Sequence, residues 1–129
     1  MLVELTTRAL TVAGAAPGLT LVQWRALVLV SSSPGLRASE AADRLGMARP
    51  SMSRLVGRLE RLGLIVAEVD PSDGRATTLR ATREGHELKD RVLATRLQLL
   101  ETALHSLTGG LPEDLVGALT AIRGAVSNA

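Results

Sequence analysis

The chain has 129 residues, of which 46% are hydrophobic and 22% are charged, and its formal net charge is +2 at pH 7. This length predicts one domain that buries about two-thirds of its unfolded surface, and the apolar fraction excludes intrinsic disorder. Cysteine is absent, which excludes disulfides, thiolate metal sites and a thiol redox switch. Trp24 is the single aromatic residue, which counts against proteins that stack single-stranded bases on aromatic side chains.

Two features of the sequence concern location and charge. No apolar run reaches membrane-spanning length, and the first residues lack the cationic start and cleavage pattern of a signal peptide. We therefore expect a cytoplasmic protein without a membrane partner. Between Arg37 and Arg61, six arginines stand against three acidic residues. Basic residues concentrated in one segment favour attraction to phosphate.

Two helices and a short strand are expected first. The first helix should cover residues 1–13 and end at the glycine- and proline-containing segment 14–18, with Leu2, Leu5, Ala9 and Val12 on one side. The second should cover residues 20–31 with Thr20 as its cap, and should bury Leu21, Trp24, Leu27, Val28 and Ser31. Trp24 is expected in the core, with a place beside an effector pocket as the alternative. Residues 36–38 should add a strand.

The next segment has the pattern of a helix-turn-helix. Ser39 is expected to cap a helix that runs to Leu45, and residues 46–48 form a tight glycine-containing turn. A second helix then begins near Pro50, which suits a first helical position, and stops at Gly63 in a left-handed conformation. Two helices joined in this way place the second in the major groove of DNA.

This second helix has two faces of different chemistry. Its apolar stripe consists of Met52, Leu55, Val56, Leu59 and Leu62, and its polar side consists of Ser51, Ser53, Arg54, Gly57, Arg58 and Arg61. Arginines can bind guanine edges and phosphates, and small side chains allow the backbone to approach the groove. Position 48, where the helix cap is expected, holds an alanine, whose side chain cannot accept a hydrogen bond from the free amides.

A β-hairpin and two long helices complete the chain. Strands are expected over residues 64–69 and 76–81, with a turn over 70–75 in which Gly74 has a permissive backbone and Arg75 lies at or near the tip. A helix capped by Thr82 should cover residues 83–108, and a last helix should follow Pro112. Their apolar stripes consist of Leu88, Val92, Leu93, Leu97, Leu100, Leu104 and Leu107, and of Leu115, Leu119, Ile122 and Val126. A second copy of the chain is the expected partner of these stripes.

The run SEAADRLGMARPSMSRLVGRLERLGLI, followed by DPSDGRATTLRATREG, resembles the multiple-antibiotic-resistance-regulator (MarR) family of transcription regulators. The resemblance includes the Asp-x-Arg of the wing, at Asp73 and Arg75, and the Thr-x-x-Gly at Thr82 and Gly85. It implies a mainly α fold with a small β-hairpin wing, as one domain over residues 1–129. The winged helix-turn-helix core would span about 20–82, and dimerisation helices would span about 1–14 and 83–127.

These observations predict a homodimeric regulator, a repressor in preference to an activator, that binds double-stranded DNA at a pseudo-palindromic operator. Base edges would be read by Ser51, Ser53 and Arg54, and phosphates would be held by Arg49, Arg58 and Arg61. Arg75 would enter the minor groove. The resemblance further implies that Asp73 orients Arg75, and that a small phenolic or lipophilic anion releases the DNA.

Catalysis is not expected. The acidic pairs lie at helix starts or on solvated faces, no histidine accompanies a nucleophile, and no glycine-rich loop follows a strand. We therefore expect no enzyme activity, cofactor or metal. Two alternatives remain: a winged helix that binds an acidic protein without specific DNA binding, and a metal-responsive repressor that uses His86 and His105 across a dimer. A metal clip of His86 and Asp90 on one helical face is disfavoured, because catalytic zinc generally takes three protein ligands.

Overall fold

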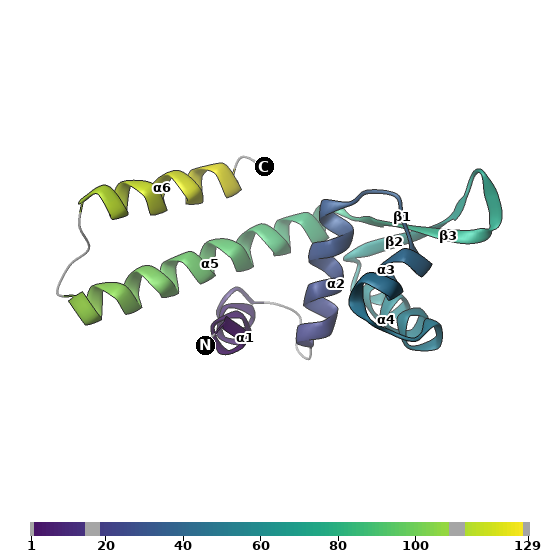
Figure 1. Cartoon of the computed structure of the whole chain (residues 1–129), viewed down its shortest axis with the longest axis horizontal. Helices are drawn as coiled ribbons and strands as arrows, with labels where there is room; N and C mark the ends of the chain where they lie inside the picture. Colours follow the sequence, from purple (N-terminus) through teal and green to yellow (C-terminus); the bar gives the residue numbers. More distant parts are fainter. Residues whose placement is uncertain (1, 15–18, 109–112, 128–129) are drawn as a thin grey trace. The chain divides into compact units, whose positions relative to one another are not determined.

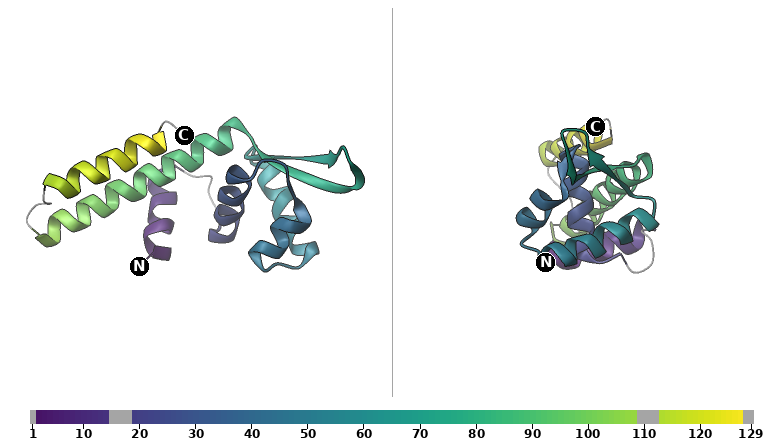
Figure 2. Two further views of the ribbon diagram at one scale, coloured as in Figure 1. Left: turned by 45° about the horizontal axis from the view of Figure 1, so that its top comes forward. Right: turned by 90° about the vertical axis from the view of Figure 1, so that its right-hand side faces the viewer.

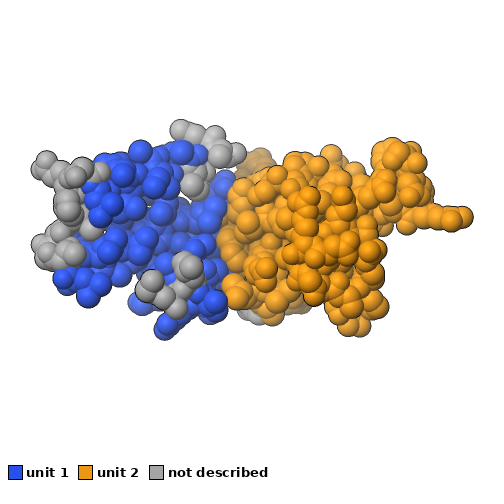
Figure 3. Space-filling view, viewed as in Figure 1, with its two compact units in different colours: residues 1–17, 90–129 blue, residues 18–89 orange. Residues whose placement is uncertain are grey.

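The computed structural model describes residues 2–14, 19–108 and 113–127. Its elements (Figure 1) are α1 (Leu2–Val12), α2 (Leu21–Ser32), β1 (Leu36–Arg37), α3 (Ala38–Leu45), α4 (Arg49–Arg61), β2 (Ile65–Asp70), β3 (Asp73–Ala81), α5 (Arg83–Thr108) and α6 (Glu113–Ser127). They form two compact units, residues Gly18–Lys89 and residues Met1–Pro17 with Asp90–Ala129 (Figure 3). The mainly α fold with a small hairpin wing is confirmed. Of the break expected at residues 14–18, Gly14 is described and has a φ of +68°, and residues 15–18 lie outside the described residues, as does the break expected at 109–110.

The unit of residues 18–89 is a helix-turn-helix beside a three-stranded antiparallel sheet of order β1-β3-β2. In the left view of Figure 2, the β2–β3 ribbon extends beyond the helices of this unit. Leu36 pairs with Leu79, and Ile65 pairs with Ala81 at the base of the ribbon. The short strand predicted at residues 36–38 is therefore confirmed as β1 over Leu36–Arg37, whereas Ala38 belongs to α3.

The turn of the ribbon differs from the sequence-based prediction. Strand β2 continues to Asp70 and β3 begins at Asp73, so the turn consists of Pro71 and Ser72 and not of residues 70–75. Gly74 lies within β3 and has no positive φ, so its backbone freedom is not what forms the turn. The physical reason is that Asp70 accepts hydrogen bonds from the amide and the hydroxyl of Ser72, at 2.9 and 2.7 Å, which closes a shorter turn.

Helix caps agree with the sequence at two of three positions. Thr20 and Gln23 form a reciprocal capping box at 3.2 and 3.0 Å, as expected for α2. The hydroxyl of Thr82 accepts from the amide of Gly85 at 3.0 Å, as expected for α5. The prediction for Ser39 is wrong, because a helix capped by Ser39 would begin at residue 40, whereas α3 already begins at Ala38. Arg37 precedes this helix, and its amide donates to the Glu40 carboxylate at 3.1 Å instead.

The core of this unit is aliphatic apart from Trp24, which is 3% exposed and therefore lies in the core as predicted. Leu27, Leu59, Ile65 and Leu79 are almost completely buried and come from α2, α4, β2 and β3. The buried face of α2 differs in part from the prediction. Ala26 and Val30 are buried, whereas the expected Leu21 and Val28 are only half-buried.

The second unit contains α1, α5 from Asp90 onward, and α6. Its buried side chains are Thr6, Ala9, Leu10, Val92 and Leu119. Arg123 of α6 pairs with Glu101 of α5 at 3.8 Å, and Figures 1 and 2 show these helices alongside each other. No helix among the described residues is long and apolar enough to cross a membrane.

Much of the apolar surface predicted for this unit is exposed. Val12, expected on the buried side of α1, is 63% exposed, and Leu107, Leu115 and Ile122 are 83%, 41% and 50% exposed. The side chains of Leu2 and Val126 lie outside the described part of the chain. Within a single chain, these stripes are therefore only partly covered.

Candidate nucleic-acid interface

Helix α4 is set between two defined ends. Ala48 precedes its first residue with an extended backbone and no side-chain cap, as predicted, and Pro50 lies in the first turn. At the other end, the amide of Gly63 donates to the Glu60 carbonyl at 2.8 Å, and Gly63 has a φ of +71°. A left-handed residue is favourable for glycine, which confirms the predicted stop.

The two faces of α4 are divided as the sequence predicts. The apolar face consists of Met52, Leu55, Val56 and Leu59, which are all buried, and Leu62 is half-buried beyond the last turn. On the other face, Ser53, Arg54 and Arg61 are exposed, whereas Ser51 and Arg58 are half-buried. The side chains that could reach a duplex are therefore serines and arginines on a helix that is held by its opposite side.

The charges on this face are weakly restrained. Arg49 lies 3.6 Å from Asp43, and both side chains are more than 60% exposed, so water screens this pair. Arg54 donates to the Ser51 hydroxyl at 3.4 Å. The carboxylate of Glu60, the single acidic side chain of α4, accepts from the Ala67 amide of β2 at 3.0 Å. The negative charge is thereby held toward β2.

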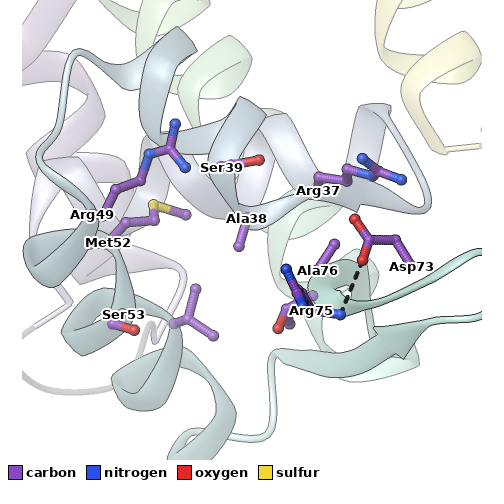
Figure 4. A pocket seen from close by; sticks show the side chains of 11 residues that line it. Arg37, Ala38, Ser39, Arg49, Met52, Ser53, Asp73, Arg75 and Ala76 are labelled. Atoms are coloured by element: carbon purple, nitrogen blue, oxygen red, sulfur yellow. Dashed lines mark hydrogen bonds between the residues drawn. The ribbon is translucent and has the colours of Figure 1, made fainter.

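A cavity of about 410 Å³ lies between α4, the start of α3 and β3. Figure 4 shows Arg49, Met52 and Ser53 on one side and Asp73, Arg75 and Ala76 on the other. The fold thus brings together four of the predicted site residues, Arg49, Ser53, Asp73 and Arg75. The other four, Ser51, Arg54, Arg58 and Arg61, do not line this cavity and remain on the α4 helix.

Arg37 and Ser39 also line the cavity, although neither was predicted as a site residue. Arg37 is the last residue of β1, and Ser39 lies in the first turn of α3. The arginine count of the segment included Arg37, but only the pairing of β1 with β3 places it beside the wing. With Arg37, Arg49 and Arg75 against Asp73, the charged lining is predominantly positive. Such a surface attracts an anionic backbone.

Arg75 lies in β3 and not at the turn, as the third residue of that strand. Its amide donates to the Asp73 carboxylate at 3.1 Å, so the hydrogen bond between these residues involves the backbone of Arg75 (Figure 4). Among the described residues, the Arg75 guanidinium has no hydrogen bond or ion pair. This exposed cation is therefore available to a partner.

Other predicted features are placed away from this cavity. Trp24 does not line it and lies in the core. His86 and His105 lie on α5, the first half-buried and the second exposed. Within the described ranges, no group of three or more histidine, aspartate or glutamate side chains could hold a metal ion.

Comparison with known proteins agrees with this geometry. Residues 18–76 match the model of the MarR family. The chain is 28% identical over 109 residues to the HTH-type transcriptional regulator FarR of Neisseria gonorrhoeae, with 82% of this chain and 75% of FarR covered. It is 33% identical over 73 residues to the homoprotocatechuate degradative operon repressor of Escherichia coli, with 57% of this chain and 49% of that repressor covered. The chain thus spans about half the length of the Escherichia coli repressor.

The fold is also similar to that of a DNA-bound protein. The structure of the transcriptional repressor CouR bound to a 23-mer DNA duplex has a TM-score of 0.68 and 27% sequence identity, and 96% of this chain and 82% of CouR are covered. The family match contains α2, the helix-turn-helix, β2 and the start of the strand that carries Arg75. The chain therefore belongs to the MarR family of winged helix-turn-helix transcription regulators.

Proposed function

We propose that this DNA-binding transcription regulator is a repressor that acts as a homodimer on a pseudo-palindromic operator. The observation that carries the proposal is the exposed face of α4, where Ser53, Arg54 and Arg61 stand opposite a buried apolar face. A helix of this kind can lie in the major groove of DNA. The FarR relative is named as a regulator, and the other two proteins compared above are named as repressors, which supports repression.

In this proposal, the residues of α4 have two roles. Ser51, Ser53 and Arg54 lie in the first two turns, the part of a recognition helix that meets base edges. The phosphates are held by Arg49, Arg58 and Arg61. These residues lie towards the ends of the helix, where the phosphate backbones that border the groove are within reach. Three phosphate-binding arginines per protomer give about six contacts in a dimer, so the operator affinity should fall about 10³-fold between 50 and 200 mM salt.

The wing supplies a separate contact. Arg75 has an exposed guanidinium without a partner among the described residues and lines the same cavity as Ser53 of α4. With α4 in the major groove, a basic side chain on the ribbon can enter the adjacent minor groove, where A·T tracts concentrate negative potential. Asp73 assists by holding the Arg75 amide at 3.1 Å.

The homodimer is supported by the exposed apolar residues of the second unit. Leu107, Leu115 and Ile122 are 41–83% exposed on helices α5 and α6, which is unfavourable in water unless another surface covers them. A second copy joined by two-fold symmetry would place two α4 helices about 34 Å apart, one turn of DNA. The division into a core of about 20–82 and dimerisation helices of about 1–14 and 83–127 is part of this proposal.

Release by a small phenolic or lipophilic anion is the regulatory part of the proposal, and family resemblance supports it. The pocket is proposed near Trp24, which is the single aromatic residue of the chain and is 3% exposed. Its fluorescence therefore reports binding without a label. Salicylate, used as the probe, should change this emission and weaken operator binding by about 5–150-fold, the range of ordinary allosteric coupling. Unchanged emission and affinity would contradict this part.

The function is tested by electrophoretic mobility shift of genomic fragments at 50, 100 and 200 mM salt. We expect a few fragments to shift, with the affinity falling steeply as salt rises. An absent or salt-insensitive shift would contradict the proposal and favour a winged helix that binds an acidic protein. A shift that appears only with added zinc would favour the metal-responsive alternative through His86 and His105.

A further inference from the structure

Asp70 is a buried carboxylate in the unit of residues 18–89, which is called the DNA-binding unit. The DNA contacts proposed above give this carboxylate no role. It is 8% exposed, and both of its oxygens are occupied. Its Oδ2 accepts a hydrogen bond from Nε of Arg37 at 2.8 Å and lies 2.7 Å from Nη2 of the same guanidinium in an ion pair. Its Oδ1 accepts from the amide and hydroxyl of Ser72 at 2.9 and 2.7 Å. A buried carboxylate is costly unless its oxygens are paired in this way.

The strand is irregular where this carboxylate is buried. Regular alternation along β2 would place Asp70 on the same side as Val66 and Glu68, which are both exposed. The register with β3 shifts between Val69 and Asp70, and Val69 itself is 66% exposed. Irregularities of this kind re-aim a side chain. Here the irregularity accompanies a carboxylate that points inward.

The ion pair joins two parts of the fold that are distant in sequence. Arg37 and Asp70 are 33 residues apart. Arg37 is the last residue of β1 and immediately precedes α3, the first helix of the helix-turn-helix. Ser72 lies in the turn of the wing. Because Arg37 pairs with Thr78 of the central strand β3, its side chain spans β3 to reach β2 on the other side.

The far half of the wing has few other supports. Among the described residues, strand β1 pairs with β3 only at Leu79 and Thr78. In the far part of the ribbon, Thr77 pairs with Val69 and Asp73 pairs with Asp70, and residues 74–76 of β3 have no register partner on either neighbouring strand. Arg75 lies in this part of the strand. A two-stranded ribbon is only marginally stable by itself and twists readily. Among the described residues, the contact between Arg37 and Asp70 is the ion pair that joins this ribbon to the residue immediately before α3.

We propose that Asp70 is a positioning residue for DNA binding: with Arg37, it holds the wing against the start of α3 and thereby fixes where Arg75 meets the duplex. The inference rests on the proposed function, in which Arg75 contacts DNA. A wing fixed before binding loses less conformational freedom when it binds, which raises affinity without adding a contact. Arg37 and Arg75 line the same cavity, so the arginine that holds Asp70 lies near the arginine that contacts DNA.

The test is a double-mutant cycle on operator DNA with Asp70→Asn and Arg75→Ala. Asparagine keeps the size of the side chain and an acceptor for Ser72, but it removes the charge that Arg37 pairs with. We expect Arg75→Ala to lower the operator affinity about tenfold in the wild-type background and less than about twofold in the Asp70→Asn background. A residue that only stabilises the fold would leave the two effects equal.

Glu68→Gln is the matched control. It removes the same charge from the same strand and breaks a 2.7 Å ion pair with Arg80, but it leaves Arg37 untouched. In this background, Arg75→Ala should retain its full tenfold effect. If Asp70→Asn does not fold, as judged by circular dichroism, Arg37→Gln takes its place in the cycle and should reduce the Arg75 effect in the same way.

Two outcomes overturn the inference in different ways. Equal effects of Arg75→Ala in the wild-type and Asp70→Asn backgrounds would show that Asp70 does not act through Arg75, and the proposed function would stand. An unchanged affinity for Arg75→Ala in the wild-type background would refute the wing contact of the proposed function, and the inference would fail with it.

Discussion

The hydroxyl of Thr82 donates a hydrogen bond of 2.6 Å to the carbonyl oxygen of Gly63, which joins the start of α5 to the end of α4. The Thr82 amide donates to the Leu64 carbonyl at 3.0 Å. Gly85 makes this close approach feasible, because a Cβ at that position would overlap the Leu64 carbonyl oxygen. The contact between Thr82 and the residues after α4 therefore fixes the end of α4. Gly85 is required at this contact because there is no space for a Cβ, and not because of an unusual backbone conformation.

Gly85→Ala should accordingly destabilise the protein. The added methyl group meets a backbone atom that cannot rotate away, so we expect a decrease of about 1–3 kcal/mol in the free energy of unfolding, the usual cost of overpacking. Gly57→Ala is the control, because its Cβ would meet only Arg61 Nη1 at 3.6 Å and should stabilise α4 by up to about 1 kcal/mol. Urea unfolding at one protein concentration measures both variants. Equal free energies of unfolding for Gly85→Ala and Gly57→Ala would contradict the close approach of Gly85 to the Leu64 carbonyl.

Arg54→Ala should relax sequence preference. Arg54 is exposed in the first half of α4, and its hydrogen bond to the Ser51 hydroxyl is long, at 3.4 Å, so it can turn toward a base. Removing an arginine that contacts a base should lower the ratio of operator affinity to random-DNA affinity about 5–100-fold. Fluorescence anisotropy with both duplexes measures the ratio. An equal decrease in affinity for operator and random DNA would refute the assignment to a base edge.

Arg58→Ala should weaken binding to all DNA about equally. Arg58 is half-buried in the last turns of α4, where it is expected to bind a phosphate and not a base. The slope of log affinity against log salt should fall in magnitude by about 1 for each phosphate that is no longer neutralised. Titrations at several salt concentrations on operator and random duplexes measure this slope. A decrease in affinity confined to the operator would move Arg58 to the base-reading group.

The anchor of the wing predicts a pH dependence of stability. Hydrogen bonds from the amide and hydroxyl of Ser72, together with Arg37, hold the pKa of the Asp70 carboxyl below its ordinary value of 3.8, although burial acts in the opposite direction. Because the pKa is lower in the folded state, ionised Asp70 stabilises the fold. This contribution is complete above the pKa of the unfolded chain and is lost as the pH falls through the folded value.

Wild type and Asp70→Asn should therefore differ in stability by a constant amount from pH 8 to about pH 5. The difference should shrink below about pH 4, because asparagine does not titrate. Urea unfolding of both proteins across this range measures the difference. If it stayed constant down to pH 3, the carboxylate would not be stabilised in the way that the hydrogen bonds indicate.

Ile122→Asp should shift the protein from dimer to monomer. Ile122 is 50% exposed on α6, and a charge in a covered apolar interface is strongly unfavourable. Val69→Asp is the control, since Val69 is 66% exposed but lies in the wing. Sedimentation velocity should show monomers for the first variant and dimers for the second. If both variants remained dimeric, α6 would not be part of the interface.

Local patterns were sufficient to predict most elements of the DNA-binding unit. The division of α4 into a buried apolar face and an exposed arginine face follows from periodicity, and the stop at Gly63 follows from the preference of glycine for a left-handed backbone. The Thr20 and Thr82 caps were also predictable, because each bonds to an amide three residues further along. These features depend on neighbours within about one helical turn.

Features that depend on distant contacts were not predictable in the same way. The wing turn was placed over residues 70–75 because Asp, Pro and Gly favour turns. The carboxylate of Asp70 instead closes a shorter turn through Ser72, and it is also held by Arg37, 33 residues away. The same contact explains why Arg37 was not recognised as part of the site. Periodicity predicted the apolar stripe of α5 that ends at Leu107. It could not show which part of the stripe a single chain leaves uncovered, and Leu107 is 83% exposed.

The central claim is that the serine and arginine face of α4 reads a two-fold-symmetric operator. The most direct measurement is sequencing of the genomic DNA that the purified protein retains at 150 mM salt, for wild type and for Arg54→Ala. We predict that the wild-type fragments share an inverted repeat with half-site centres about 10–10.5 base pairs apart, and that the variant retains fragments with a weaker shared sequence. Wild-type fragments without any shared sequence, or with one unpaired half-site, would contradict the account.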